Sequence, residues 1–184
     1  MIVLHINSYY PSSDLYRQML LHFEPESGCS HVVYVPIAAD RDATVRSVAP
    51  ADVSVVYSAD YRHLDRWHYH SKRLKIVRSL ERQIDLLTVS AIHAHHLFTA
   101  GGVACELKRR YGVPYVVAVR NTDINWFFRY ALHLRSMGLT ILQEASRVVF
   151  ISPSGLEGLR NYVPCSQWPS VVAKSVIIPN GVDD

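Results

Sequence analysis

Cysteine pairs, an amino-terminal leader and long apolar runs are all missing from this 184-residue sequence. Its three cysteines, Cys29, Cys105 and Cys165, are far apart and form no C-x-x-C motif, which argues for a reducing compartment and against a disulfide or zinc framework. No stretch approaches the about 18 apolar residues that a transmembrane helix requires, and the first residues, MIVLHINSYY, carry no basic leader. We therefore expect a cytoplasmic protein, either soluble or peripheral at the inner face of the membrane.

Glycine-rich phosphate-binding motifs are missing as well. Residues 7–14 (NSYYPSSD) follow the first expected strand without any glycine, so a G-x-G-x-x-G dinucleotide site is not expected there. The absence of G-x-x-x-x-G-K-[ST] excludes P-loop phosphoryl transfer, and the surroundings of Ser154 lack the G-x-S-x-G elbow of serine hydrolases. A net charge of only +3 argues against a nucleic-acid partner, for which a clustered basic strip would be needed.

The residues that are present predict one globular domain. Hydrophobic residues make up 49% of the chain and charged residues 19%, a composition that excludes a disordered chain. Short apolar segments alternate with longer helical ones, and several of them are apolar nearly throughout, as in strands buried on both faces of a parallel sheet. The expected strands are residues 2–6, 31–37, 53–57, 91–95, 115–119, 147–151 and 175–178.

These strands and the helices between them predict a Rossmann-like, doubly wound, mainly parallel α/β sheet of about seven strands with helices on both faces. Apolar residues recur at three- and four-residue steps over 71–90. A second helix over 97–111 is expected to end at Gly112, which suits a left-handed C-cap, because Pro114 prevents continuation.

Two further helices are expected in the second half of the chain. One is a single long helix over 125–145, and the other covers 152–162, with Ser152 as its N-cap and Pro153 at its first position. Residues 40–51 and 60–70 are expected to be loops or short irregular elements.

Ligands of such a sheet bind beyond the carboxyl ends of the strands, at the point where the strand order reverses. Asn7 follows the first strand, and Ser12 and Ser13 can cap a helix whose N-terminus attracts an anion; an ordinary N-cap is the alternative. In residues 92–102 (IHAHHLFTAGG), His93 and His95 share one face of a strand and His96 the other.

This histidine-rich segment supplies at most two converging metal ligands, so no metal site is expected. His95, at a strand end, suits a hydrogen bond to a hydroxyl or phosphate. For His93, a position in the core or on the surface is the alternative.

A second polar cluster follows the strand at 115–119. Arg120 comes directly after a buried strand and needs a partner, either a carboxylate or the phosphate of a ligand. Asn121 and Asp123 are candidates for ligand contact, although Asp123 or Thr122 can instead cap the following helix. Along 71–90, Lys75, Arg78 and Arg82 share a basic face, which is either a solvated surface or a contact with an anionic membrane leaflet.

In chain order, these segments resemble the N-terminal half of a family-four glycosyltransferase of the two-domain GT-B architecture. The matching segments are INSYYP, IHAHH, GVPYVVAVRNTD, ASRVVFISPSGLEGL and VIIPNGVD, and the last resembles the signature that ends the first domain of that family. The resemblance implies retaining transfer of a sugar from a nucleotide-sugar co-substrate to a glycan or lipid-linked acceptor, without a cofactor or an essential metal.

The resemblance also implies a division of labour, because the N-terminal domain of the family mainly binds the acceptor and the C-terminal domain binds most of the donor. Residues 1–179 would form the acceptor-side domain and residues 180–184 the start of a linker to the C-terminal donor domain. Since the paired-glutamate donor signature of the family belongs to that second domain, we expect the chain alone to transfer no sugar.

Two departures from the family pattern concern the site. Ser12 and Ser13 stand where the family commonly has a glycine pair, and residues 120–123 (RNTD) stand where many members have His-Gly-x-Asp. Arginine cannot act as a general base but can hold a phosphate or an acceptor hydroxyl. The candidates for the reacting centre are therefore His95 and Arg120, and the candidates for substrate binding are Asn7, Ser12, Ser13, His93, Asn121 and Asp123. The alternatives are a non-catalytic α/β module for a phosphorylated or sugar ligand, and a membrane-surface adaptor.

Overall fold

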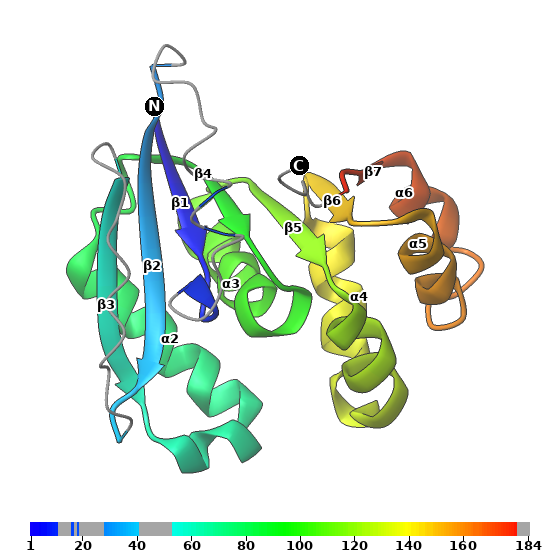
Figure 1. Cartoon of the computed structure of the whole chain (residues 1–184), viewed down its shortest axis with the longest axis horizontal. Helices are drawn as coiled ribbons and strands as arrows, with labels where there is room; N and C mark the ends of the chain where they lie inside the picture. The colour runs from blue at the N-terminus through cyan, green and yellow to red at the C-terminus, as the bar shows by residue number, and fades with distance from the viewer. Residues whose placement is uncertain (11–15, 17, 19–27, 41–52, 180–184) are drawn as a thin grey trace.

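The computed structural model describes residues 1–10, 16, 18, 28–40 and 53–179. Its strands form one parallel sheet in the order β3-β2-β1-β4-β5-β6-β7, so the strand order reverses between β1 and β4 (Figure 1). This is the doubly wound, Rossmann-like topology that the sequence predicts. The strands are β1 (Ile2–Ile6), β2 (Ser30–Ala38), β3 (Val53–Tyr61), β4 (Val89–Ala94), β5 (Tyr115–Val119), β6 (Arg147–Phe150) and β7 (Ser175–Ile177).

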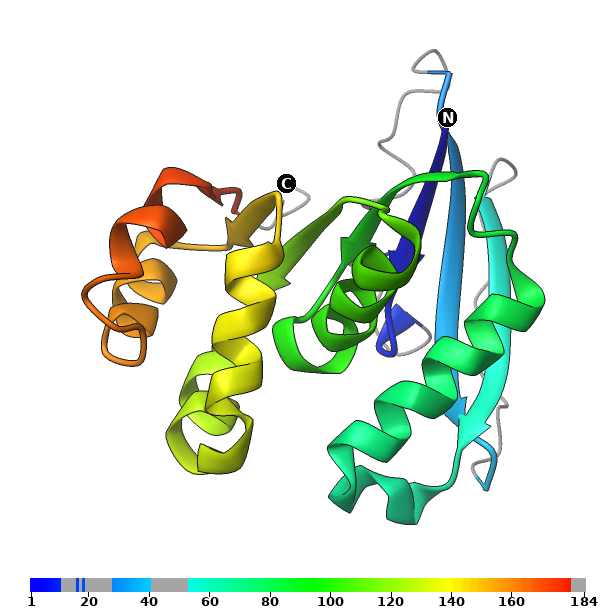
Figure 2. The ribbon, with the colours of Figure 1, turned by 180° about the vertical axis from the view of Figure 1, so that it is seen from behind.

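Three helices, α2, α3 and α4, lie side by side over one face of the sheet (Figure 2). The connections from β1 to β2 and from β2 to β3 run mostly through residues outside the described part of the chain. The helices are α2 (Tyr69–Gln83), α3 (Gly102–Tyr111), α4 (Arg135–Glu144), α5 (Pro153–Arg160) and α6 (Trp168–Ala173). Shorter helical segments are η3 (His63–Trp67), η4 (Leu97–Gly101), η5 (Asp123–Phe128) and η6 (Leu132–Leu134).

The two faces of the sheet bury different sets of side chains. The main core lies between the sheet and the helices α2, α3 and α4, and it includes Leu4 and Ile6 of β1. A smaller cluster on the other face consists of Tyr10, Tyr16, Val33, Val35 and Val53. Because side chains alternate along a strand, His5 lies on the opposite face from Leu4 and Ile6. A polar side chain is thereby placed beneath the smaller cluster, at the centre of the sheet.

Several helix signals in the sequence are confirmed. Gly112 takes the left-handed conformation with φ of 74° at the end of α3, where a residue with a side chain would be strained. The Ser152 hydroxyl accepts a hydrogen bond from the backbone of Gly155 (3.2 Å), and Pro153 is the first residue of α5. The short helix α6 was not expected.

The expected helix over 71–90 is wrong at both ends. Helix α2 begins at Tyr69 and stops at Gln83, so Leu87 lies outside it and is 86% exposed. Asp85 forms a local turn instead, because its carboxylate accepts from the backbone of Leu87 (3.1 Å) and its carbonyl from the hydroxyl of Thr88 (2.7 Å). Residues 60–70, expected to be irregular, mostly belong to β3, η3 and α2, while residues 41–51 of the other expected loop lie outside the described residues.

The expected long helix over 125–145 is also wrong, because it is interrupted at Ala131 (φ −87°, ψ 65°). The side chain of Arg135 stabilises the break: its guanidinium donates to the carbonyls of Phe128 (2.6 Å) and Arg129 (3.4 Å). These carbonyls lie at the end of η5, where the last carbonyls of a helical segment have no partner in the next turn. Tyr130, next to the break, is 63% exposed.

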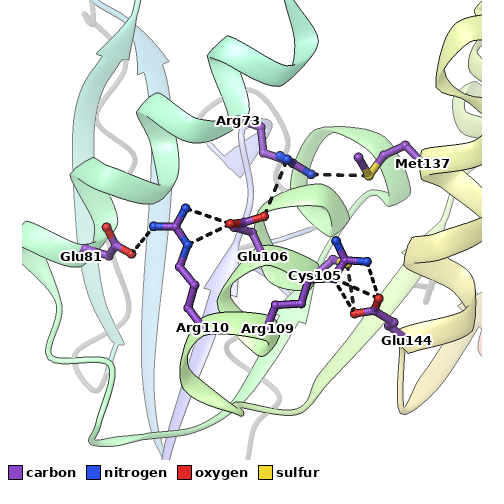
Figure 3. A network of polar contacts seen from close by, with 8 residues as sticks. All are labelled: Arg73, Glu81, Cys105, Glu106, Arg109, Arg110, Met137 and Glu144. Atoms are coloured by element: carbon purple, nitrogen blue, oxygen red, sulfur yellow. Dashed lines mark hydrogen bonds and ion pairs between the residues drawn. The ribbon is translucent and has the colours of Figure 1, made fainter.

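Ion pairs join α2, α3 and α4 along their outer surfaces (Figure 3). Arg110 of α3 contacts both Glu81 of α2 (3.0 Å) and Glu106 of its own helix (2.8 Å). Arg109 forms a bidentate pair with Glu144 at the end of α4. Because these pairs are partly exposed, each contributes at most about 1 kcal/mol to stability.

The basic residues Lys75, Arg78 and Arg82 are all exposed on α2, and Lys75 pairs with Asp65 (2.7 Å). Within the described ranges, none of the helices combines the length and the apolar character that crossing a membrane would need.

Candidate functional site

The strands β1, β4 and β5 are neighbours in the sheet, and a polar residue follows each of them at its carboxyl end. Asn7 comes directly after β1, His95 directly after β4 and Arg120 directly after β5. The parallel pairing fixes this proximity: His5 of β1 lies in register with His93 of β4, and the backbone of His95 donates to the carbonyl of Ile6. The predicted site residues of three separate segments therefore meet where the strand order reverses.

Four histidines gather on the sheet face opposite the main core. His5 is central, with its Nδ1 3.1 Å from Nε2 of His95 and its Nε2 3.0 Å from Nδ1 of His31. The rings of His93 and His95 are stacked with their centroids 4.1 Å apart. We call His5, His31, His93 and His95 the histidine cluster. His5 and His95 are fully buried, whereas His31 and His93 are partly exposed.

Burial keeps the cluster uncharged. Desolvation, followed by the charges of the neighbouring rings, lowers the pKa of His5 and of His95 well below the ordinary value. Burial and the Arg120 guanidinium lower the pKa of His93 to about 4. A neutral imidazole has one donor and one acceptor nitrogen. Hydrogen bonds connect the rings of His31, His5 and His95 in series. At the end of this series, the Nδ1 of His95 is buried with no partner among the described residues.

Tyr16 covers the cluster and connects it to His96. The Tyr16 ring meets His95 edge-on, with centroids 5.2 Å apart, and its hydroxyl lies 2.9 Å from Nε2 of His96. His95 and His96 were expected on opposite faces of a strand. Because β4 ends at Ala94, the strand alternation no longer applies, and Tyr16 contacts both side chains.

Arg120 lies next to the histidine cluster at the end of β5. Its Nε donates to the carbonyl of His95 (3.4 Å), and its guanidinium carbon is 5.9 Å from the centre of the Tyr16 ring. The side chain is partly exposed. A cationic group held by neighbouring backbone at this edge can interact with a phosphate or a hydroxyl of a ligand.

Asp123 is almost fully buried, at 1% exposed, and its carboxylate is bound by backbone. One oxygen accepts from the N–H groups of Leu97 (3.2 Å) and Arg120 (2.9 Å), and the other accepts from Phe98 (3.2 Å). Asp123 thus caps the neighbouring helical segment η4 and fixes the loop that carries Arg120. Burial raises its pKa to about 6, although these hydrogen bonds and Arg120 oppose the rise. Ligand contact by Asp123 stays a prediction.

The remaining predicted residues differ in their surroundings. Asn7 is 1% exposed; its Oδ1 accepts from the backbone of Tyr9 (2.9 Å), and its Nδ2 has no partner in the described part of the chain. Asn121 is exposed beside Arg120. Ser12 and Ser13 lie outside the described residues.

Sequence reasoning missed His5, His31 and Tyr16. His5 could have been found from two signals together: it alternates with the apolar Leu4 and Ile6, and β1 must pair with β4 in this topology. His31 is opposite Val3 in the register of β1 and β2, so it contacts His5 diagonally across the two strands. Tyr16 lies in the segment after β1. The sequence pattern gives no signal for these two.

Comparisons with known proteins agree with this architecture. Sucrose-phosphate synthase from Thermosynechococcus elongatus has a similar structure, with a TM-score of 0.66 and 16% identity over 100% of this chain and 91% of the other. UGT2 of Phytolacca americana, complexed with UDP-2-fluoro-glucose and pterostilbene, matches with a TM-score of 0.54 and 13% identity, over 97% of this chain and 54% of the other. At these identities the likeness shows a shared fold.

No curated protein matches the chain in sequence. The family of glycosyl transferase 4-like domains matches residues 18–181, which is most of the sequence. This chain therefore belongs to the glycosyl transferase 4-like domain family and has the Rossmann-like fold of an N-terminal domain of GT-B glycosyltransferases.

Proposed function

We propose that this domain is the acceptor side of a retaining glycosyltransferase that transfers a sugar from a nucleotide-sugar to a glycan or glycolipid acceptor. Family membership supports glycosyl transfer. The observation that carries the proposal is the position of Arg120 at the carboxyl end of β5, beside the reversal of strand order where ligands of such sheets bind. One structural neighbour was solved with a nucleotide-sugar analogue, which supports the same class of donor.

Arg120 would stabilise negative charge that develops during transfer. Breaking the bond between the sugar and the nucleotide leaves a diphosphate whose charge exceeds that of the bound donor, so a fixed guanidinium lowers the barrier. The structure supports a fixed position, because Asp123 holds the Arg120 backbone and the His95 carbonyl accepts from its side chain. The unpartnered Nδ2 of Asn7 would donate to a hydroxyl of the acceptor.

His95 remains a candidate for contact with the acceptor hydroxyl. Its imidazole is fully buried, with Tyr16 against it, so such a contact requires Tyr16 to move aside. With Tyr16 in place, His95 acts on the site through its carbonyl, by positioning Arg120. His93 and Asn121 would line the same edge.

A second domain would complete the cleft and bind most of the donor. The edge strand β7 is suited to such a neighbour, since Val176, Ile177 and the following Ile178 are between 40% and 55% exposed. We propose accordingly that the chain alone is inactive. The full-length enzyme would need no cofactor besides the nucleotide-sugar and would work in the cytoplasm, with α2 as its peripheral contact to the inner membrane face.

The test is sugar transfer by the natural gene product, assayed with UDP- and GDP-hexoses against a panel of oligosaccharide and glycolipid acceptors. Arg120→Ala is expected to lower kcat about 100-fold or more, the loss typical of removing one stabiliser of transition-state charge. Arg129→Ala, an exposed arginine at the end of η5, is the matched control and should leave kcat unchanged. An Arg120→Ala protein with the control's kcat would contradict the proposed role.

A further inference from the structure

Three residues of the histidine cluster converge on one point of the sheet. His5 comes from β1, and His93 and His95 come from β4 and the residue after its end. Each offers a ring nitrogen, and these three nitrogens all lie within 4.8 Å of one another. The H-x-H-H segment alone provides only two such ligands. The third comes from a strand that is distant in sequence and adjacent in the sheet.

One pair of ring nitrogens in this group has the spacing expected for coordination to one small ion. Ligand nitrogens at about 2.0–2.1 Å from a tetrahedral Zn²⁺ are separated from one another by about 3.3 Å. The Nδ1 of His5 and the Nε2 of His95 are 3.1 Å apart, close to that separation. The His93 ring is stacked on the His95 ring, and its ligand nitrogen lies within 4.8 Å of those of the other two histidines.

The surroundings of His5 also match a metal ligand. When a histidine binds a metal through one ring nitrogen, the other nitrogen usually donates to a partner that fixes the ring. His5 directs Nδ1 toward His95, while its Nε2 lies 3.0 Å from Nδ1 of His31. His95 differs, because its other ring nitrogen, Nδ1, is buried without a partner in the described ranges.

We propose that His5, His93 and His95 bind a transition-metal ion, foremost Zn²⁺, through three imidazole nitrogens, with His31 orienting His5 from the outer shell. Imidazole donors favour zinc, copper, nickel and cobalt over magnesium or calcium, which prefer oxygen. The nearby Arg120 guanidinium repels any cation, so coordination by the imidazole nitrogens has to supply the binding energy. Three protein ligands leave a fourth position for water or an anion.

Bound metal would join β1 to β4 across the reversal of strand order. This linkage is separate from the proposed role of Arg120 in sugar transfer, because Arg120 is not one of the three ligands. Since the ion binds the folded chain, saturating Zn²⁺ is expected to raise the midpoint of thermal unfolding.

The direct test is titration of metal-stripped chain with Co²⁺, followed by its visible absorption, and then displacement by Zn²⁺. The expected result is one Co²⁺ per chain with the intense bands of four-coordinate cobalt, lost as Zn²⁺ replaces it. Mg²⁺ should not compete. Absence of stoichiometric binding, or only the weak bands of six-coordinate cobalt, would overturn the proposal.

Three variants distinguish this site from histidines at the surface. His31→Ala removes a residue that only orients a ligand, so it should weaken Zn²⁺ affinity by about 10–100-fold. His93→Ala removes the most accessible ligand itself and should weaken the affinity by more than that. The matched control is the double variant His70→Ala/His133→Ala. It removes two histidines that line a surface pocket at the start of α2. The proposal is wrong if the control loses the affinity or if His93→Ala keeps it.

Circular dichroism decides whether each variant is folded before its affinity is used. Should His93→Ala unfold, X-ray absorption of the zinc-loaded wild-type chain decides instead. Scattering from three imidazoles with Zn–N distances of about 2.0–2.1 Å is expected. Fewer than three imidazoles, or sulfur in the first shell from a cysteine, would overturn the assignment.

Discussion

Asp123→Ala tests whether a buried carboxylate organises the site. The substitution removes the acceptor of three backbone N–H groups, of which those of Leu97 and Phe98 are buried and that of Arg120 is partly buried. An unpaired buried donor costs about 1–3 kcal/mol. Two such donors at about 2 kcal/mol each, with about 1 kcal/mol for the third, give a loss of about 5 kcal/mol.

The buried charge of Asp123 destabilises the folded chain, so its removal opposes the loss of stability from the broken hydrogen bonds. Burial raises its pKa from 3.8 to about 6, a difference that corresponds to about 3 kcal/mol at about 1.36 kcal/mol per pH unit. Between these values the folded chain binds more protons than the unfolded chain, so this group lowers the free energy of unfolding as pH rises. Removing the carboxylate therefore removes a destabilisation of the folded chain of about 3 kcal/mol at pH 7.5, and a smaller one at pH 5. The expected net loss in the free energy of unfolding is about 2 kcal/mol at pH 7.5 and about 1 kcal/mol more at pH 5.

Urea unfolding followed by circular dichroism at the two pH values measures this difference. The matched control is Asp85→Ala, whose exposed carboxylate accepts one turn hydrogen bond and whose loss should cost about 0.5 kcal/mol at either pH. Other titrating groups cancel in the comparison with wild type. A loss for Asp123→Ala that is equal at both pH values, or smaller at pH 5, would refute the reasoning about the buried charge.

Three further predictions concern stability, and urea unfolding measures each. Gly138→Ala should lower the free energy of unfolding by about 1 kcal/mol. The new Cβ would lie 2.7 Å from Phe98, and the cost of this overpacking exceeds the gain of about 1 kcal/mol in helix propensity. An unchanged or higher stability would show that the rings adapt. Ser152→Ala should cost about 1 kcal/mol through the lost cap to Gly155, and no loss would argue against the cap. Arg110→Ala should cost less than about 1 kcal/mol and nothing in high salt; a larger, salt-independent loss would contradict a surface role.

The sheet was predictable because its strands carry a local signal. Continuous apolar runs such as residues 115–119 mark strands buried on both faces, and alternation with helices fixes a parallel order. The helix ends were less predictable. The break at Ala131 depends on Arg135, which reaches back to the carbonyls of η5, and this contact leaves no mark in the apolar periodicity.

For the candidate site, the sequence predicts which segments come together but not which side chains touch. His95 and Arg120 were selected because they lie at strand ends and because residues 120–123 depart from the His-Gly-x-Asp pattern of the family. The histidine cluster depends on which strands become neighbours, so His5 is identified only once β1 pairs with β4. The role of Asp123 is similarly non-local, since it caps the helical segment that begins at Leu97 and not the one that follows it in sequence.

We propose that ligands bind at the carboxyl ends of β1, β4 and β5. This binding can be followed in amide ¹H–¹⁵N correlation spectra of the chain while an oligosaccharide panel and UDP-glucose are titrated. We expect shifts concentrated at Asn7, at His95 and His96, and at Arg120 and Asn121, and their loss in Arg120→Ala. Shifts confined to the exposed face of α2, or none with any sugar, would contradict it.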